Sequence, residues 1–400
     1  MIHEFLDFRL DVERMELWCG AEKRAVEPQV FSLLVYLIEN RDRVVGKDEL
    51  FDAVWEGRIV SDATLNTRIN AARKALGDSG KEQAVIRTIP RRGFRFVAET
   101  ADSGAPSAEA RKQSPKQTVR FCTTADGVQI AYAISGEGPP LVKAPNWMHH
   151  LEYDWDSPVW GHLLRDLSRT HTLLRFDQRC NGLSDWDVPE VTFETMVEDM
   201  AAVVDAAGFT RFPLLGISAG CCYSIAYAVR HPERVSRLIL YGGRAQGRMR
   251  TGSDADKRLH ETRREMMLQG WGQNNPAFRQ FFTSLFIPDA TKEQMDWFNE
   301  LQRTTVSPEN AVRLNEVSGH ADVSNLLGQI SVPTLVLHCR EDGTVPFEKG
   351  RRMASMIPNA RFVALDGKNH LILEDESAWP RFLAEVKDFL AEDDTAVRCR

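Results

Sequence analysis

The spacing of apolar and polar residues divides the chain into two parts with different patterns. In the first part it predicts helices at 27–40, 47–55 and 62–76, followed by two strands at 85–89 and 94–97. The third helix has one apolar stripe, made of Leu65, Ile69, Ala72 and Leu76, and Ser61 before it is a suitable N-cap. Three helices followed by a strand pair indicate a helix-turn-helix with a C-terminal hairpin.

In the second part, apolar runs typical of buried strands alternate with helical segments. Strands are predicted at 128–134, 141–144, 172–176, 212–217, 238–241, 334–338 and 361–365. This alternation predicts a doubly wound, mostly parallel sheet with helices on both faces. Between about 244 and 330 the strand runs stop, and the helical pattern there predicts a cap over the sheet.

Residues 99–118 separate the two parts and are predicted to form a flexible linker. They are rich in Ser, Ala, Pro and other polar residues and have no helical or strand periodicity. The expected organisation is therefore a domain at 1–98, a linker at 99–118 and a second domain at 119–400. A length of 400 residues also favours two domains.

The charge of the chain is unevenly distributed. The net charge is -7, which alone argues against binding to nucleic acid. However, residues 1–57 hold 7 Lys and Arg against 13 Asp and Glu, whereas residues 58–98 hold 9 against 3. A basic surface is therefore expected around the third helix and the strand pair.

Several features indicate a cytoplasmic protein without a metal or cofactor. No apolar run is long enough to span a membrane, and the N-terminus lacks the pattern of a signal peptide. The 7 cysteines are scattered without CxxC spacing, which favours free thiols over disulfides or a zinc site. His149 and His150, with Asp154 and Asp156, lack the spacing of metal ligands and are interpreted as loop residues.

The outer face of the third helix has the chemistry of a DNA-reading surface. The residues expected to point outward are Asn66, Thr67, Arg68, Asn70, Arg73 and Lys74. Such side chains contact phosphates and base edges in the major groove, although an ordinary solvated helix face has the same composition. The hairpin favours DNA binding, because Arg91 and Arg92 stand at its turn and can reach the backbone or the minor groove.

The first 98 residues resemble the OmpR/PhoB-type winged-helix family. The segments that carry the likeness are VEPQVFSLLVYLIENRDRVV, ELFDAVW and RTIPRRGFRF. The resemblance implies that 62–76 is the recognition helix and that Arg91 and Arg92 belong to the wing. It also implies promoter DNA as a partner, with RNA polymerase as a further candidate. A homodimer is expected because tandem half-sites need two readers.

In the second part, Gly216-Ile217-Ser218-Ala219-Gly220 follows a predicted strand and precedes a helical run, as in a nucleophile elbow. Asp342 and His370 each follow a later strand, in the chain order that a Ser, acid and His triad requires. Asp366 is a less favoured acid because it is close to His370 in sequence. The oxyanion donors are expected to be the backbone N–H of Ala219 and that of Trp147 or Asn146.

Residues 119–392 look like the α/β-hydrolase fold family. The likeness is carried by GPPLVKAPNWMHHLEYDW, LLRFDQRCNGLSDW, LLGISAGCCYSIAYAVRHPERVSRLILYGG, PTLVLHCREDGTVPF and FVALDGKNHLILEDE. The resemblance assigns nucleophile, acid and base to Ser218, Asp342 and His370. Two positions depart from it, since Asn146 and Cys180 stand where the family usually has Gly.

Aromatic residues of the cap predict an apolar ligand pocket beneath it, although they could equally form the core of the cap itself. The pocket residues are expected to be Trp147, Trp271, Phe282, Phe286 and Trp297.

The resulting hypothesis is a one-component transcriptional regulator that binds a small apolar ester, lactone or aromatic ligand. Its triad is interpreted as a ligand-binding relic, as a slow hydrolase that resets the signal, or as a full catalyst. The alternative hypothesis is a working serine esterase or lactonase with an accessory DNA-binding domain.

Overall fold

The computed structural model describes residues 2–12, 14–20, 22–41, 44–55, 62–79, 82–89, 93–98, 100–102 and 116–392. The chain forms two compact units, at 1–114 and 115–400. Each unit has its own hydrophobic core and is described by itself. Among the described residues, no helix has both the length and the apolar character needed to cross a membrane.

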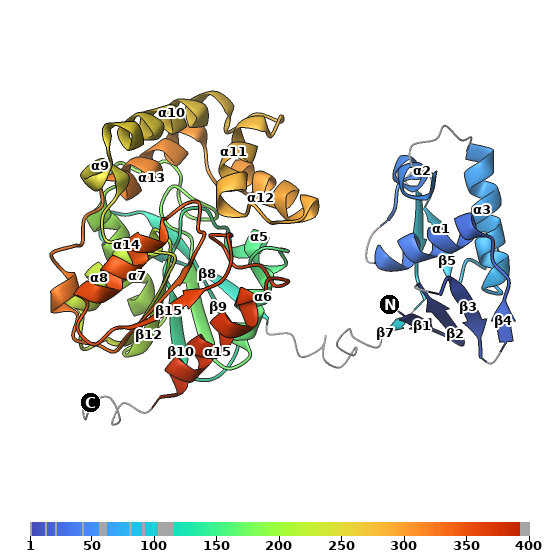
Figure 1. Ribbon diagram of the computed structural model, residues 1–400, viewed down its shortest axis with the longest axis horizontal. Coiled ribbons are helices and arrows are strands. Elements are labelled where there is room, and N and C mark those ends of the chain that lie inside the picture. The colour runs from blue at the N-terminus through green and yellow to red at the C-terminus, as the bar shows by residue number, and fades with distance from the viewer. Residues whose placement is uncertain are drawn as a thin grey trace. The chain divides into compact units, whose positions relative to one another are not determined.

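The first unit combines an antiparallel sheet with three helices and a hairpin (Figure 1). The sheet has the order β4-β3-β2-β1-β7. Its strands are β1 (Ile2–Phe5), β2 (Phe8–Asp11), β3 (Glu16–Cys19), β4 (Glu22–Arg24) and β7 (Thr100–Asp102). The helices are α1 (Pro28–Glu39), α2 (Lys47–Trp55) and α3 (Asp62–Ala75), and the hairpin is β5 (Ile86–Ile89) with β6 (Gly93–Phe96). Together these elements form a winged helix-turn-helix domain.

Two details of this unit differ from the sequence-based expectation. Strand β7 lies within the range predicted as a linker, because its backbone pairs with β1 and needs no apolar run to do so. Arg73 was predicted to face outward, but it is buried. Its guanidinium donates to the carbonyl of Ile86 at 2.7 Å and to the hydroxyl of Thr88 at 2.9 Å. Arg73 follows Ile69 by one helical turn, which places it at the edge of the buried stripe.

The second unit is built on an eight-stranded sheet of order β15-β14-β13-β12-β10-β11-β9-β8. Strands β10 to β15 pair in parallel, whereas β8 and β9 are antiparallel to their neighbours. The strands are β8 (Gln117–Thr123), β9 (Gln129–Ser135), β10 (Pro140–Lys143), β11 (Thr172–Phe176), β12 (Phe212–Ile217), β13 (Val235–Tyr241), β14 (Thr334–Cys339) and β15 (Arg361–Leu365). The sequence analysis did not predict β8.

Helices cover both faces of this sheet, as expected for a doubly wound fold (Figure 1). They are α5 (Leu151–Trp155), α6 (Gly161–Ser168), α7 (Phe193–Ala206), α8 (Gly220–Arg230), α14 (Phe347–Met356) and α15 (Ala378–Ala391). Helices α7, α8 and α14 lie on one face. Helices α6 and α15 lie on the other, where the rings of His162 and Trp379 pack 4.4 Å apart.

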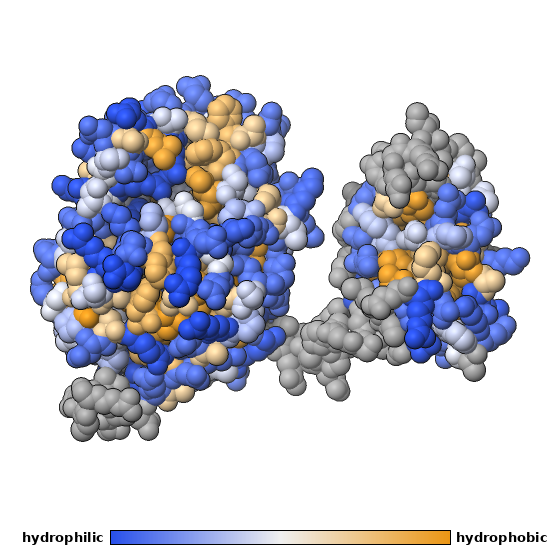
Figure 2. Space-filling model, in the orientation of Figure 1, coloured by the Kyte–Doolittle hydropathy of each residue, from blue (hydrophilic) through white to orange (hydrophobic). Residues whose placement is uncertain are grey.

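A helical cap lies over the carboxyl ends of the parallel strands. It consists of α9 (Arg248–Thr251), α10 (Asp254–Gly270), α11 (Ala277–Phe286), α12 (Lys292–Thr305) and α13 (Pro308–His320), followed by the 3-10 helix η1 (Leu327–Gln329). Buried Arg279 joins three of these segments, since its guanidinium donates to the carbonyls of Trp271, Gln273 and Asn299. Figure 2 shows mostly polar side chains on the viewed face of this unit, with apolar groups in a band that continues onto the cap.

Candidate active site

Ser218 stands in a strained turn between β12 and α8. Its φ is 54°, in the left-handed region that most side chains avoid. The flanking glycines make the turn possible: a Cβ at Gly216 would lie 2.7 Å from the hydroxyl of Ser224, and one at Gly220 would lie 2.5 Å from the carbonyl of Pro145. The backbone therefore has the form of a nucleophile elbow, which presents the Ser218 side chain at the end of the strand.

Asp342 and His370 meet at the ends of the neighbouring strands β14 and β15. The carboxylate of Asp342 lies 2.6 Å from Nδ1 of His370, and both side chains are buried. The other carboxylate oxygen accepts hydrogen bonds from the backbone of Thr344 and Val345, at 2.8 and 2.9 Å. Burial alone would raise the pKa of Asp342. Attraction to His370 and these hydrogen bonds outweigh that effect and hold the pKa below its ordinary value.

The other ring nitrogen of His370, Nε2, is buried and has no hydrogen-bond partner among the described residues. The contact of Nδ1 with Asp342 therefore leaves Nε2 available to accept a proton. The sequence analysis missed His338, whose Nε2 lies 2.8 Å from the carbonyl of Val345 and 3.5 Å from Asp342. His338 thus supports the loop that carries Asp342.

The loop after β10 passes over the N-terminus of α8, as the close approach of Pro145 to Gly220 requires. The Ala219 N–H stands at that helix end, where backbone donors and the helix dipole favour negative charge. The side chain of Asn146 turns away from the cavity. It accepts from the ammonium of Lys143 at 2.6 Å and donates to the carbonyl of Met148 at 3.1 Å. Asn146 therefore does not narrow the space beside Ser218.

Beneath this loop lies a cluster of buried charges. Lys143, Asp154, Arg175 and Asp177 are all buried. Burial lowers the pKa of Lys143 and raises that of Asp154, and the attraction between the two opposes both changes. This cluster supports the segment that carries Asn146 and Trp147.

A cavity of about 50 Å³ lies between the cap and Ser218. Its apolar lining includes three of the predicted pocket residues, Trp147, Phe282 and Phe286. The other two predicted residues, Trp271 and Trp297, are not part of this lining. Trp271 does not line the cavity but packs behind it, against Trp147 and Phe282, and Trp297 stacks on Tyr153. Both rings therefore pack at the contact between the cap and the rest of the unit.

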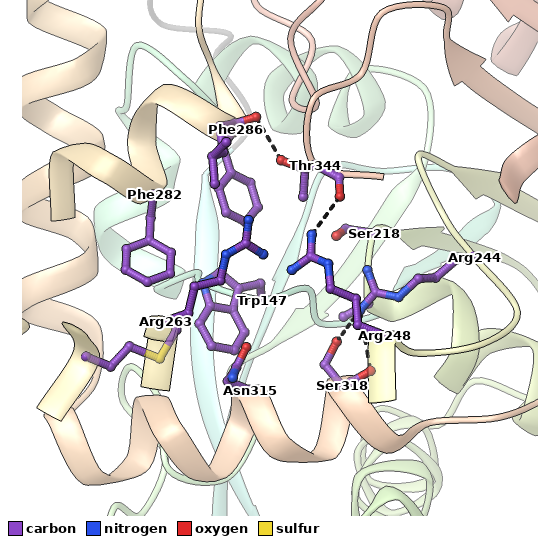
Figure 3. A pocket seen from close by; sticks show the side chains of 13 residues that line it. Trp147, Ser218, Arg244, Arg248, Arg263, Phe282, Phe286, Asn315, Ser318 and Thr344 are labelled. Atoms are coloured by element: carbon purple, nitrogen blue, oxygen red, sulfur yellow. Dashed lines mark hydrogen bonds between the residues drawn. The ribbon is translucent and has the colours of Figure 1, made fainter. Parts of the chain in front are cut away.

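An apolar pocket had been predicted, but charged and polar side chains also line the cavity. Figure 3 shows Arg244, Arg248 and Arg263 entering it from the loop after β13, from α9 and from α10, together with Asn315 and Ser318 of α13. These arginines were not predicted from the sequence, because the aromatic residues of the cap indicate only the apolar part of the lining. A signal was present, since Arg263 shares the inner face of α10 with His260 and Met267.

In the first unit, the face of α3 that was predicted to read DNA is largely accessible. Asn66, Thr67, Asn70 and Lys74 are exposed. Arg68 is partly covered, because its guanidinium pairs with Glu27 and donates to Gln29 at 3.1 Å. The predicted wing residues Arg91 and Arg92 lie outside the described residues.

Two further expectations concern single positions. Cys180 has a φ of 68°, so this side chain occupies a backbone conformation that suits glycine, but it is buried and does not line the cavity. His149 lies 2.9 Å from Asp177, and His150 caps α5. Among the described residues, no three His, Cys, Asp or Glu side chains are placed to hold a metal ion.

Comparison with known proteins gives two family matches. The α/β hydrolase fold matches residues 150–377, and the C-terminal domain of transcriptional regulatory proteins matches residues 21–96. Pyrrolizixenacetamide deacetylase of Xenorhabdus hominickii is 26% identical over 66% of this chain and 96% of its own length. Non-heme chloroperoxidase of Kitasatospora aureofaciens is 25% identical over 68% and 98%. An esterase structure from Exiguobacterium antarcticum matches with a TM-score of 0.59 and 23% identity, over 69% of this chain and 100% of that chain.

Proposed function

We propose that this chain is a one-component regulator whose hydrolase unit binds and slowly cleaves a small ester or lactone. The chain belongs to the α/β-hydrolase fold family and also carries the DNA-binding domain of transcriptional regulators. The observation that carries the proposal is the position of Ser218. It stands in a strained elbow beside a cavity, and the Asp342–His370 pair follows two other strands of the same sheet, β14 and β15. The same chain presents an exposed α3 face suited to DNA.

In the proposed reaction, Nε2 of His370 takes the proton of the Ser218 hydroxyl as its oxygen forms a bond to the ester carbonyl carbon. The resulting oxyanion is stabilised by the N–H groups of Ala219 and of Trp147. The ester C–O bond then breaks, and the alcohol leaves with the proton from His370. Water, activated by His370, releases the acid and restores Ser218.

The small cavity links ligand binding to the state of the cap. A volume of about 50 Å³ holds one or two water molecules, whereas ligand pockets usually measure several hundred Å³. A ligand of ordinary size therefore enters only when the cap moves. A cap with an open and a closed state supplies the two conformations that regulation by a ligand requires.

The experiment that tests this function measures binding of the full-length protein to DNA from its own gene neighbourhood, for the wild type and Ser218→Ala, with a panel of esters and lactones. We expect both proteins to bind specific DNA, and we expect the active compound to change the DNA affinity of both. Only the wild type should reverse that shift over time, as the compound is consumed.

The second candidate function is that of a working esterase or lactonase. It is favoured by the Asp342–His370 contact and by the available Nε2 of His370. Rapid hydrolysis that is lost in Ser218→Ala, together with no specific DNA binding, would establish this alternative and refute the regulator.

A further inference from the structure

The cavity beside Ser218 is lined by positive charges that have no carboxylate partner among the described residues. Arg244 donates to the hydroxyl of Ser318 at 3.0 Å, and Arg248 donates to the carbonyl of Thr344 at 2.9 Å. Arg263 forms no hydrogen bond or ion pair with any described residue, and its Nε is buried without a partner. Its guanidinium lies 5.9 Å from the centroid of the Phe281 ring.

The position of Arg263 is costly unless an anion binds there. Its exposed fraction is only 7%, so its guanidinium has lost most of its hydration without gaining a counter-charge. Burial, assisted by repulsion from Arg244, lowers the pKa of Arg263 to about 10. The group therefore stays charged at neutral pH and faces the cavity as an unpaired cation (Figure 3).

From this arrangement we propose that the ligand of the hydrolase unit is a small organic acid, and that Arg263 binds its carboxylate. A guanidinium offers two parallel N–H donors, which match the two oxygens of a carboxylate. Arg244 stands close enough to add to the positive potential, and its contact with Ser318 keeps it at the cavity wall.

The rest of the lining defines the body of the ligand. Trp147, Phe282 and Phe286 supply apolar surface, and Ser218 marks where a carbonyl would react. The ligand class is therefore an acid with an apolar or aromatic body, such as the monoester of a dicarboxylic acid. This assignment rests on the proposed function only for the reacting carbonyl. Recognition of the acid rests on Arg263, with Arg244 adding to the positive potential.

The test uses full-length Ser218→Ala protein, in which ligand is bound without turnover. Phenylacetate, neutral phenylacetamide and inorganic phosphate are titrated by calorimetry and by thermal unfolding. Each titration is repeated with Arg263→Met and Arg263→Lys added. Arg264→Met is the matched control, because Arg264 is the next residue on α10 and is exposed.

Phenylacetate is expected to bind and to raise the unfolding temperature, while phenylacetamide binds at least about tenfold more weakly. Arg263→Met should weaken phenylacetate binding about tenfold or more, Arg263→Lys should restore part of it, and Arg264→Met should leave it unchanged. Equal binding of acid and amide, no binding of phenylacetate at millimolar concentration, or tighter binding of phosphate than of phenylacetate each overturns the assignment.

In the otherwise wild-type protein, a second measurement compares mono-4-nitrophenyl glutarate with its methyl ester. The ratio of kcat/KM for the acidic over the neutral substrate should fall about tenfold or more in Arg263→Met and stay as in the wild type in Arg264→Met. An unchanged ratio in Arg263→Met overturns the assignment. If the protein hydrolyses neither substrate and binds no DNA, the proposed function fails, but the binding result with Ser218→Ala still decides the ligand class.

Discussion

Replacing Arg279 by Met should loosen the cap far more than the loss of an ordinary surface charge. The exposed fraction of Arg279 is 1%, and its guanidinium donates to the carbonyls of Trp271 at 2.5 Å, Gln273 at 2.6 Å and Asn299 at 2.9 Å. Met fills a similar volume but donates no hydrogen bond. The carbonyls of Trp271 and Gln273 lose this donor, whereas that of Asn299 keeps its hydrogen bond within α12. The substitution therefore separates the loss of stability caused by broken hydrogen bonds from the loss that a new cavity would cause.

The magnitude follows from the number and burial of the acceptors. An acceptor left unsatisfied in the interior costs about 1–3 kcal/mol, and the carbonyls of Trp271 and Gln273 both lose their donor. We expect Arg279→Met to lose about 3–5 kcal/mol. Folded domains have a total stability of only about 5–15 kcal/mol, so the cap should open locally before the sheet unfolds.

The assay is hydrogen exchange followed by mass spectrometry, with urea unfolding as the global measurement. Peptides from α10, α11 and α12 should exchange faster in Arg279→Met, while peptides from the central strands change little. Arg303→Met is the control, because Arg303 makes an exposed ion pair with Glu300 that is worth about 0–1 kcal/mol. If both variants lose the same small amount, the reasoning from buried acceptors is wrong.

Three further predictions concern pH, DNA binding and the loop beside Ser218. Burial lowers the pKa of His162 from 6.5 to about 4. Between these two pH values the unfolded chain therefore binds a proton that the folded chain excludes. Stability is therefore lost as the pH falls. In urea unfolding, the free energy of unfolding of His162→Gln should fall by about 2 kcal/mol less than that of the wild type between about pH 7 and about pH 5. An equal fall in both proteins contradicts this role of His162. Lys74→Ala should weaken binding to every DNA sequence and reduce the salt dependence of binding by about one ion, because Lys74 is exposed on α3. Arg73→Ala should mainly lower the melting temperature of the first unit, because Arg73 is buried. The reverse pattern refutes the assignment of α3 as the DNA-reading helix. Gly220→Ala should reduce ester hydrolysis without unfolding the protein, because the new Cβ would displace Pro145, and normal kcat would show that this loop does not supply the oxyanion donor.

The parallel strands could be predicted because they are buried on both faces and form continuous apolar runs, as in Thr334–Cys339. Strand β8 was missed for the opposite reason. Its residues, Gln117–Thr123, are mostly exposed or half-buried at the edge of the sheet, and polar residues precede it. Edge strands are held by backbone pairing, which leaves little trace in the composition.

The positions of Ser218, Asp342 and His370 could be inferred because each depends on a local rule: a turn that needs small residues, or a place after a strand. Arg73 and Arg263 could not be placed in the same way. Arg73 lies at the edge of an apolar helix stripe, and Arg263 lies on the inner face of a largely polar helix. At either place an arginine side chain can turn to solvent or to the interior. Which of the two occurs depends on the packing partner, and that partner is distant in sequence.

Two hydrogen bonds within the second unit join the end of α11 to the segments that carry Asp342 and His370. The amide of His370 donates to the carbonyl of Phe286 at 2.8 Å, and the ring of Phe286 lies 5.4 Å from that of His370. The hydroxyl of Thr344, beside Asp342, likewise donates to the carbonyl of Leu285 at 2.7 Å. A movement that lifts this end of α11 must break both bonds. Under the proposed function, the cap cannot admit a ligand and hold His370 in place at the same time. The fraction of time that the cap spends closed then sets an upper limit on how often Ser218 can react.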